Sequence, residues 1–310
     1  MRIVSLIASA TEIVAALGLG DQLVGISHEC DYPPEAIRGR PVLTGPKMDV
    51  KKRSLDIHKD VQAIVSLGLS VYKLDVDKLK SVRPDVIITQ DQCEICAVTY
   101  HDVVEATEKC LETDAKIVTL HPDSLDDIFK DILKVGEGLS ARQKALDLVK
   151  DIRGKMDKIA LEAKKIARKP KVVCLEWLNP LMAAGNWIPE MVAMAGGVNG
   201  FTKKGDHTKI IRWEELKEYD PDILLVMPCG FTLEQSLENR ADLVNLPGFD
   251  NLKAFQNKKI FVIDGNTYMN RPGPRILESF TILAGLFHSK EFSWPFPNGA
   301  LVEWGGSSAG

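Results

Sequence analysis

The chain has 310 residues, of which 45% are hydrophobic and 26% charged, and its formal net charge is −4. This length and apolar content suit two compact lobes. The charges are mixed in sign and no apolar run approaches the length of a membrane span, so neither nucleic-acid binding nor membrane insertion is expected.

The N-terminus and the cysteines bear on the cellular compartment. The chain runs directly into a strand-like segment, with no leader or lipobox cysteine. Six cysteines do not form a disulfide framework in a chain of this size, and four are scattered singly, which is typical of a reducing compartment. We therefore expect a cytoplasmic protein, or a periplasmic or extracellular one if a leader has been removed.

Strand-like and helix-like segments alternate through the first half of the chain. Arg2–Ile7 reads as a buried strand, and Ser9 followed by Glu12 has the spacing of a capping box, which predicts a helix from about Ala10 to Leu17. Further strands are expected at Leu23–Ser27, Arg83–Thr89 and Lys116–Leu120, helices at Leu55–Leu67, Val76–Val82, Val98–Cys110 and Ser124–Val135, and loops at His28–Pro34, Gly39–Pro46 and Gln90–Cys96.

The segment from Ser140 to about Pro170 predicts one long helix. Ser140 with Gln143 has capping-box spacing, and Pro170 is a stop signal. Its apolar residues form one stripe at alternating three- and four-residue steps: Ala145, Val149, Ile152, Met156, Ile159, Ala163 and Ile166. Such spacing also fits a coiled-coil dimer. Because both flanks contain alternating strands and helices, we interpret the helix as a strut between two lobes.

The second half repeats features of the first. RPDVIIT at residues 83–89 is echoed by DPDILLV at residues 220–226, and Arg2–Gly20 is echoed more loosely by Lys171–Gly197. Further strands are expected at Lys171–Leu175 and Lys259–Ile263. Helices are expected with Pro189 in the first turn, at Trp213–Glu218, beyond Gly230 to about Val244 and at Pro274–Phe287.

These elements predict an α/β fold of two doubly wound lobes bridged by one long α-helix, with a ligand cleft between the lobes. The expected division is an N-terminal lobe at residues 1–139, the linking helix at 140–170, a C-terminal lobe at 171–290, and a Pro- and Gly-rich tail at 291–310.

Several motifs resemble those of the helical-backbone (class III) ABC-type substrate-binding proteins, in particular the vitamin B12-binding branch. They are RIVSLIASATEIVAALGLGDQLVGISHECDYPPE, RPDVII, LNPLMAAGNWIPEMVAMAGGVNGF and MNRPGPRILE, and they cover about Arg2 to His288. The resemblance implies a non-catalytic protein that binds cobalamin or another corrinoid and delivers it to the permease of an ABC importer. Relatives also bind heme, ferric siderophores or metal ions. Asp77 and Glu190 match acidic positions that dock onto the importer.

A flat macrocycle would be bound by rings and polar groups in the strand-exit loops. The aromatic candidates are Tyr32, Tyr72, Trp177, Trp187 and Tyr268. The polar candidates are Ser9 and Thr11 at a helix start, His28 and Glu29, the amides Gln92 and Asn186, and Arg271 together with Arg275. Each ring taken singly could equally belong to the core, and the arginines could cap the lobe.

Cysteine and histidine offer a second interpretation. Cys93 and Cys96 form a CxxC motif, and His28 and Cys30 could complete a Zn, Co or Fe site with them. Free cysteines also pack as small hydrophobic residues. A soft-metal binding or sensing protein is thus the alternative to a corrinoid binder. A thiol-dependent enzyme is less favoured, because no nucleophile elbow or phosphate-binding glycine loop is present.

Overall fold

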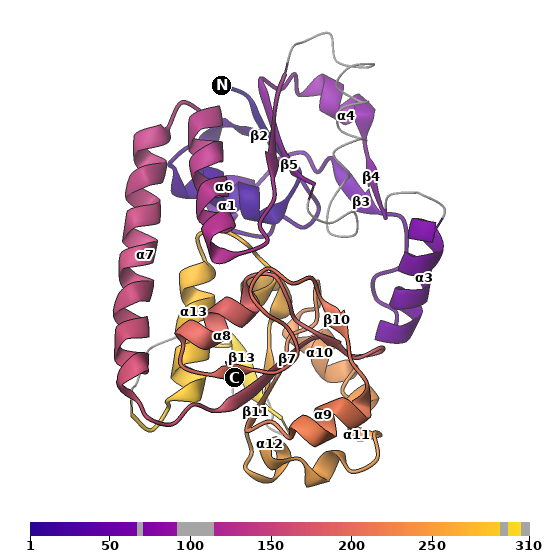
Figure 1. The fold of residues 1–310 in the computed structure, drawn as a ribbon. Helices are drawn as coiled ribbons and strands as arrows, with labels where there is room; N and C mark the ends of the chain where they lie inside the picture. The colour runs from indigo at the N-terminus through magenta and orange to yellow at the C-terminus, as the bar shows by residue number, and fades with distance from the viewer. Residues whose placement is uncertain (67–70, 92–114, 292–296, 305–310) are drawn as a thin grey trace. The chain divides into compact units, whose positions relative to one another are not determined.

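The computed structural model describes residues 1–66, 71–91, 115–291 and 297–304 (Figure 1). The chain forms two compact units, which confirms the predicted two-lobed α/β fold. The first unit comprises residues 1–52, 59–122 and 126–152, and the second comprises residues 53–58, 123–125 and 153–310. These units do not test the predicted domain limits or the predicted ligand cleft. Both stay predictions.

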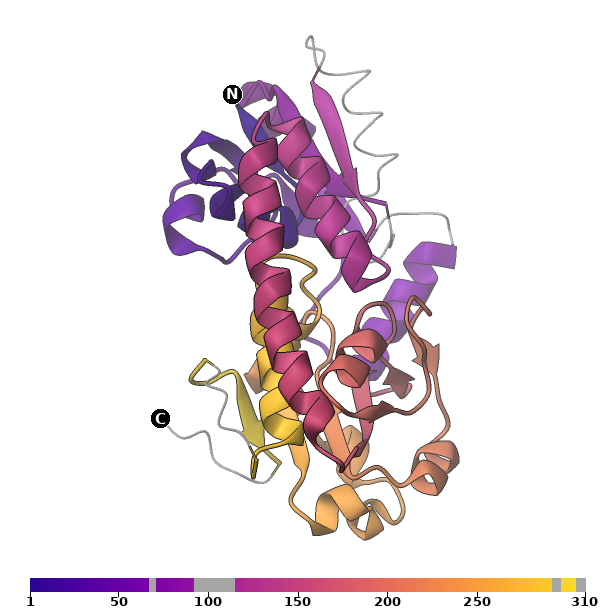
Figure 2. The same ribbon diagram turned by 60° about the vertical axis from the view of Figure 1, so that its left-hand side comes forward.

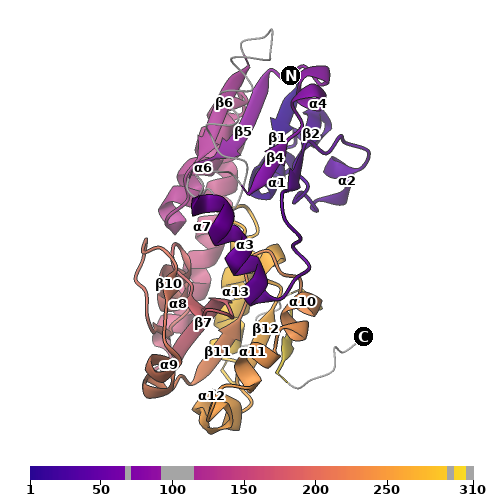
Figure 3. The same cartoon turned by 90° about the vertical axis from the view of Figure 1, so that its right-hand side faces the viewer.

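A parallel four-stranded sheet is the centre of the first unit. Its order is β2 (Leu23–Ile26), β1 (Ile3–Ser5), β5 (Val86–Gln90) and β6 (Lys116–Leu120), and the four strands can be followed in Figure 3. Every residue of β5 is buried, as its apolar run predicts. Among its described residues this unit contains the helices α1 (Ala8–Ala16), α2 (Pro34–Ile37), α4 (Val76–Ser81) and the greater parts of α3 (Ser54–Ser66) and α6 (Leu125–Gly138), with the short 3-10 helix η1 (Gly20–Gln22).

Two strands of the first unit, which form a small sheet of their own, were not expected. The prediction of a loop over Gly39–Pro46 is wrong at its end, because β3 (Thr44–Pro46) pairs antiparallel with β4 (Tyr72–Leu74). Gly45 and Pro46 disfavour a strand in an isolated sequence. Pro46 is tolerated here because a two-stranded sheet has only edge strands.

Both capping-box predictions are wrong. Helix α1 begins at Ala8, and its N-cap Ile7 has no side-chain cap, so Ser9 lies inside the first turn. Ser140 has φ = 56°, in the left-handed region, so it cannot be an N-cap. It instead ends α6: the Ser140 N–H donates to the Glu137 carbonyl and the Ala141 N–H to the Gly136 carbonyl, the two bonds of a Schellman motif.

The long helix is confirmed as α7 (Arg142–Lys165), and its residues belong partly to each unit. Ala145, Val149, Ile152, Met156 and Ala163 are buried, whereas Ile159 and Ile166 are partly exposed. The N-terminal part of α7 lies beside α6 in the first unit, as Figures 1 and 2 show. A Cβ atom on Gly136 of α6 would lie 2.4 Å from Cβ of Ala145, so this close approach requires glycine.

The second unit has a larger mixed sheet of order β10-β8-β7-β11-β12-β13, in which β9 also pairs with β7. The strands are β7 (Lys171–Trp177), β8 (Met182–Ala183), β9 (Val198–Asn199), β10 (Lys209–Ile210), β11 (Ile223–Val226), β12 (Ile260–Ile263) and β13 (Leu301–Glu303). The helices are α8 (Ile188–Met194), α9 (Trp213–Tyr219), α10 (Leu233–Glu238), α11 (Ala241–Val244), α12 (Lys253–Gln256) and α13 (Ile276–Phe287), with η2 (Phe249–Asn251) and the π-helical turn η3 (Gly265–Met269). The composition of the tail did not predict β13, which pairs antiparallel with β12.

The sequence repeat has a structural counterpart. β5 and β11 each lie beside the first strand of their unit, β1 and β7. The Asp85 carboxylate accepts the backbone N–H of Arg2 at 2.7 Å, and the Asp222 carboxylate accepts that of Lys171 at 2.9 Å. The repeated Pro-Asp pair therefore attaches the start of one parallel strand to the next in both units.

Across the described ranges, no helix combines the length and apolarity needed to cross a bilayer.

Candidate functional site

In the first unit, polar side chains gather where the parallel strands end. His28 follows β2, and its Nδ1 lies 2.7 Å from Oγ1 of Thr44, which in turn donates to Ser27. The His28 ring packs against the Tyr72 ring with centroids 5.0 Å apart. Its Nε2 lies 3.1 Å from Oε1 of Glu29, within ion-pair distance but without the alignment of a hydrogen bond. The structure thus brings the predicted residues His28, Glu29 and Tyr72 together.

The predicted residues around α1 are more deeply enclosed. Thr11 is fully buried, donates to Oγ of Ser5 at 2.8 Å, and lies 3.0 Å from Sγ of Cys30. Ser9 is buried, and its Oγ has no hydrogen-bond partner within the described part of the chain. Tyr32, by contrast, is 43% exposed. Gln92 lies outside the described residues.

Gln90 is a polar residue of this rim that the sequence reasoning did not single out. It is the last residue of β5 and is 3% exposed, yet among the residues described its Nε2 donor has no partner. Buried donors are normally satisfied. The available signal was an amide at the end of an apolar strand segment.

A second polar group lies at the ends of β5 and β6. Nδ1 of His121 is 2.7 Å from Oδ1 of Asp91, and the His121 backbone N–H donates to the buried Asp131 at 2.9 Å. Burial raises the pKa of Asp131 to about 6, against the lowering effect of that hydrogen bond.

The aromatic candidates of the second unit differ in exposure. Trp177, at the end of β7, is partly exposed and its ring lies 5.1 Å from that of Phe231. Trp187 is 6% exposed, and its indole N–H donates to the Met269 carbonyl. The Trp187 indole is therefore held inside the unit, whereas Trp177 is only partly buried.

The turn after β12 carries the remaining predicted candidates. Tyr268 is partly buried, and the Arg275 guanidinium lies 5.9 Å from its ring centroid. Arg271 is 3% exposed and donates to Oδ1 of Asn266 at 3.1 Å. Both arginine side chains therefore contact other residues of the protein, Arg275 the Tyr268 ring and Arg271 the Asn266 side chain.

Glu176 is an acid of the second unit whose environment raises its pKa, and the sequence analysis did not single it out. It is the penultimate residue of β7; Thr208 donates to its carboxylate, as does the Gly185 N–H. Although part of the side chain remains accessible, the carboxyl group is enclosed, and this loss of solvation raises its pKa. The available signal was a carboxylate directly after the apolar run of residues 172–175.

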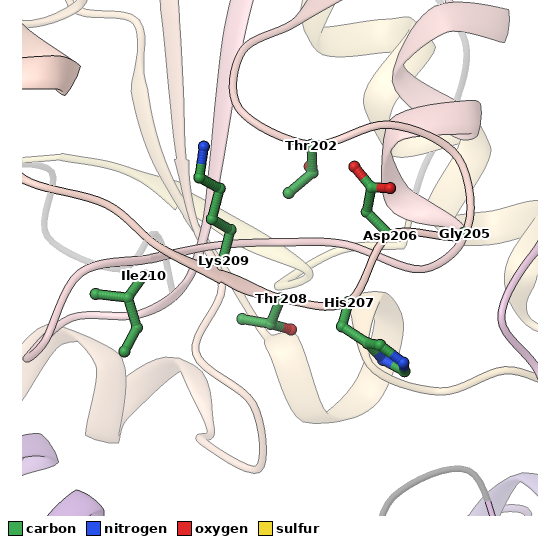
Figure 4. Close-up of a pocket in the computed structure, with 7 residues that line it drawn as sticks. All are labelled: Thr202, Gly205, Asp206, His207, Thr208, Lys209 and Ile210. Atoms are coloured by element: carbon green, nitrogen blue, oxygen red, sulfur yellow. The ribbon is translucent and has the colours of Figure 1, made fainter.

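Asn186 follows Gly185 and joins its loop to the segment before Thr208 by backbone hydrogen bonds. Its φ is 53°, its N–H donates to the Asp206 carbonyl at 2.6 Å, and its carbonyl accepts the Gly205 N–H at 3.0 Å. A Cβ atom on Gly185 would lie 2.2 Å from the Asp206 carbonyl oxygen, so glycine is required for the two segments to approach. A pocket of about 700 Å³ is lined by Thr202 and residues 205–210 (Figure 4).

The metal-site and docking predictions have different outcomes. Cys93 and Cys96 lie outside the described residues, so the Cys/His site is not tested. Within the ranges that are described, no group of three or more His, Cys, Asp and Glu side chains could hold a metal ion. Of the two docking candidates, Asp77 is exposed in the first turn of α4. Glu190 instead pairs with Lys204 at 2.6 Å and accepts the Leu125 N–H.

Comparison with known proteins gives relatives over nearly the whole chain. The chain is 23% identical over 294 residues to an uncharacterised ABC transporter substrate-binding lipoprotein of Bacillus subtilis, covering 94% of this chain and 81% of that protein. It is 24% identical over 278 residues to the vitamin B12-binding protein of Vibrio vulnificus, covering 89% and 86%.

Solved structures share the fold. A periplasmic heme-binding protein of Pseudomonas aeruginosa superposes with a TM-score of 0.72 at 20% identity, covering 97% of both chains. The sequence model described as periplasmic binding protein matches residues 3–267. The chain therefore belongs to the periplasmic binding protein family.

Proposed function

We propose that this protein is a non-catalytic binding protein for a tetrapyrrole-type ligand, a corrinoid or heme, which it delivers to an ABC importer. The observation that carries the proposal is the match of nearly the whole chain to proteins named for vitamin B12 or heme binding. Its relatives include a transporter lipoprotein, which favours a location outside the cytoplasm over the cytoplasmic location that the scattered cysteines suggest.

The strand-exit residues supply the required chemistry. Tetrapyrroles have a large apolar face, and binding proteins bury such faces against aromatic side chains while a few polar groups fix orientation. The candidates with accessible or partly accessible rings are Tyr32, Tyr72, Trp177 and Tyr268. His28 offers an imidazole that could face a central metal ion.

The test is titration of the purified protein with cyanocobalamin and, separately, with hemin. Binding should change the absorption spectrum of the ligand and raise the melting temperature. At a free ligand concentration of 100 times Kd the stabilisation is about 2.7 kcal/mol. If neither ligand gives a spectral change or a thermal shift, the proposal fails.

A further inference from the structure

Positive charge is concentrated in the C-terminal half of α7 and its link to β7, a segment that belongs to the second unit (Figure 2). Between Arg153 and Lys171 there are eight Lys and Arg residues and only two acids, Asp157 and Glu162, which gives a formal net charge of +6. The whole chain has a net charge of −4, so the remaining residues carry −10. A strongly basic segment in an otherwise acidic chain indicates an anionic partner.

The cations of this segment lie on the protein surface. All except Lys171 are exposed. Two of the exposed amino groups have identified partners: Lys165 pairs with Glu162 at 2.6 Å, and Lys169 donates to the Ala163 carbonyl at 3.2 Å. These contacts hold the side chains at the surface but neutralise only one of the charges.

Three further cations have no acidic partner in the described part of the chain. They are Lys158, Lys164 and Arg168. A surface of opposite charge can attract these side chains without first breaking an ion pair of the protein. The segment therefore has positive charge that is free to act on a partner.

An apolar side chain lies among these cations. Leu161 is 61% exposed. Its neighbours three and four positions away on the helix are Asp157, Lys158, Lys164 and Lys165. An exposed leucine between lysines suits a membrane surface, because the leucine can enter the boundary of the acyl chains while the lysine amino groups reach the charged headgroups.

The composition of the segment disfavours a nucleic acid as the partner. Six of its eight cations are Lys, and it contains no aromatic residue. Nucleic-acid sites use Arg for bidentate contacts and aromatic rings for stacking on the bases. Lysine-rich clusters are instead typical of segments attracted to anionic lipids.

We propose that the exposed face of Arg153–Lys169, with Leu161 at its centre, binds the surface of an anionic phospholipid bilayer. The contact is peripheral and places the side chains, not the helix itself, in the headgroup layer. It goes beyond the proposed function, because it concentrates the protein at a membrane whether or not a ligand is bound.

The experiment measures co-sedimentation of the full chain, without ligand, with vesicles of equal parts phosphatidylglycerol and phosphatidylcholine and with vesicles of phosphatidylcholine alone. A charge variant combines Lys158→Gln, Lys164→Gln and Arg168→Gln, which break no identified ion pair. A control variant removes the same charge from three exposed lysines elsewhere in the chain, by Lys51→Gln, Lys80→Gln and Lys203→Gln. A third variant, Leu161→Gln, removes the apolar side chain and keeps the charge. Because all these positions are exposed, the melting temperatures should stay close to that of the wild type.

The wild-type chain should bind the anionic vesicles and not the neutral ones, and binding should weaken when salt is raised from a low concentration to about 0.15 M. The charge variant should bind about a hundredfold more weakly, at about fivefold for each cation removed. The control variant should lose less than about threefold. Leu161→Gln should weaken binding about tenfold and leave its salt dependence unchanged.

Three results overturn the proposal: no binding to the anionic vesicles, equal binding to both kinds of vesicle, or equal losses in the charge and control variants. Binding to polyuridylate in place of vesicles, or self-association of the chain through the same cations, would also overturn it. Unchanged vesicle affinity of Leu161→Gln would overturn the role of Leu161. None of these results bears on the ligand titrations, so the membrane surface and the proposed function can fail separately.

Discussion

The two units build the same parallel arrangement but end their strands with different chemistry. β2-β1-β5-β6 in the first unit corresponds to β9-β7-β11-β12 in the second. The Pro-Asp pair before β5 recurs before β11 with the same hydrogen bond. At the ends of the strands, however, the two units differ: Gln90 is the last residue of β5 and His28 follows β2, whereas Glu176 is the penultimate residue of β7. Residues that support the scaffold are repeated, while residues that could contact a ligand have diverged.

The largest expected effect comes from matched core positions in the repeat. Ile88 of β5 and Leu225 of β11 are both fully buried. Ile88→Ala and Leu225→Ala should each lower the free energy of unfolding by about 2–5 kcal/mol, because each leaves a cavity. Urea denaturation measures this. A loss below about 1 kcal/mol at either position would show that the two strands are not equivalent core elements.

A buried acid of the first unit gives a pH-dependent prediction. The folded pKa of Asp131, about 6, lies above its ordinary 3.8, so the protonated form is favoured by folding. Its stabilising contribution is complete below pH 3.8 and is lost as pH rises through 6. Asp131→Asn should therefore gain stability relative to wild type between pH 3.5 and 7.5, by up to about 3 kcal/mol.

Denaturation of both proteins across this pH range measures the gain. Asn can still accept the His121 N–H, so a lost hydrogen bond does not mask the effect. Parallel stability curves for the two proteins would contradict the raised pKa.

The repeated Pro-Asp pair gives a smaller, paired prediction. Asp85→Ala and Asp222→Ala each remove a carboxylate that accepts a strand N–H, at Arg2 and Lys171. Each should cost about 1–2 kcal/mol, with the greater loss at Asp222 because its bond is partly buried and the other is exposed. Thermal denaturation compares the two, and a greater loss at Asp85 would reverse the expected ranking.

The smallest effect concerns the residue before each Pro-Asp pair. Arg83 and Asp220 both have left-handed backbone, with φ of 41° and 47°. Arg83→Gly should stabilise the protein by up to about 1 kcal/mol, because glycine adopts this backbone without strain. Asp220→Gly should not, because the Asp220 carboxylate accepts the Lys253 N–H at 3.0 Å. Equal changes in melting temperature at the two positions would contradict the distinction.

The sequence predicted the periodic and repeated features well. The stripe on α7 and the apolar runs of β5 and β11 are strong signals because each depends on regular spacing over many residues. The capping boxes failed because Ser9 and Ser140 have the correct spacing but a different backbone: one lies inside a helix and the other ends the preceding helix. Local spacing does not encode the tertiary packing that decides between these outcomes.

The candidate site was predictable only in part. His28, Glu29 and Tyr72 could be expected from polar and aromatic residues in strand-exit loops. Gln90 and Glu176 were passed over because a single polar residue after an apolar strand is common, and its burial depends on segments distant in sequence, such as the Thr208 loop. The enclosure of Trp187 likewise depends on Met269, 82 residues away.

The short segment 53–58 belongs to the second unit although it interrupts the first. Ser54 and Arg53 both bond the Asp242 carboxylate, the latter at 2.8 Å, and the Ser54 N–H donates to Asn239. The Asp242 side chain is only 4% exposed. A fragment of the protein that begins at Arg153 would therefore contain Asp242 without its partners Arg53 and Ser54. If the two halves are expressed separately, we expect the C-terminal half to fold poorly unless a peptide of residues 53–58 is added.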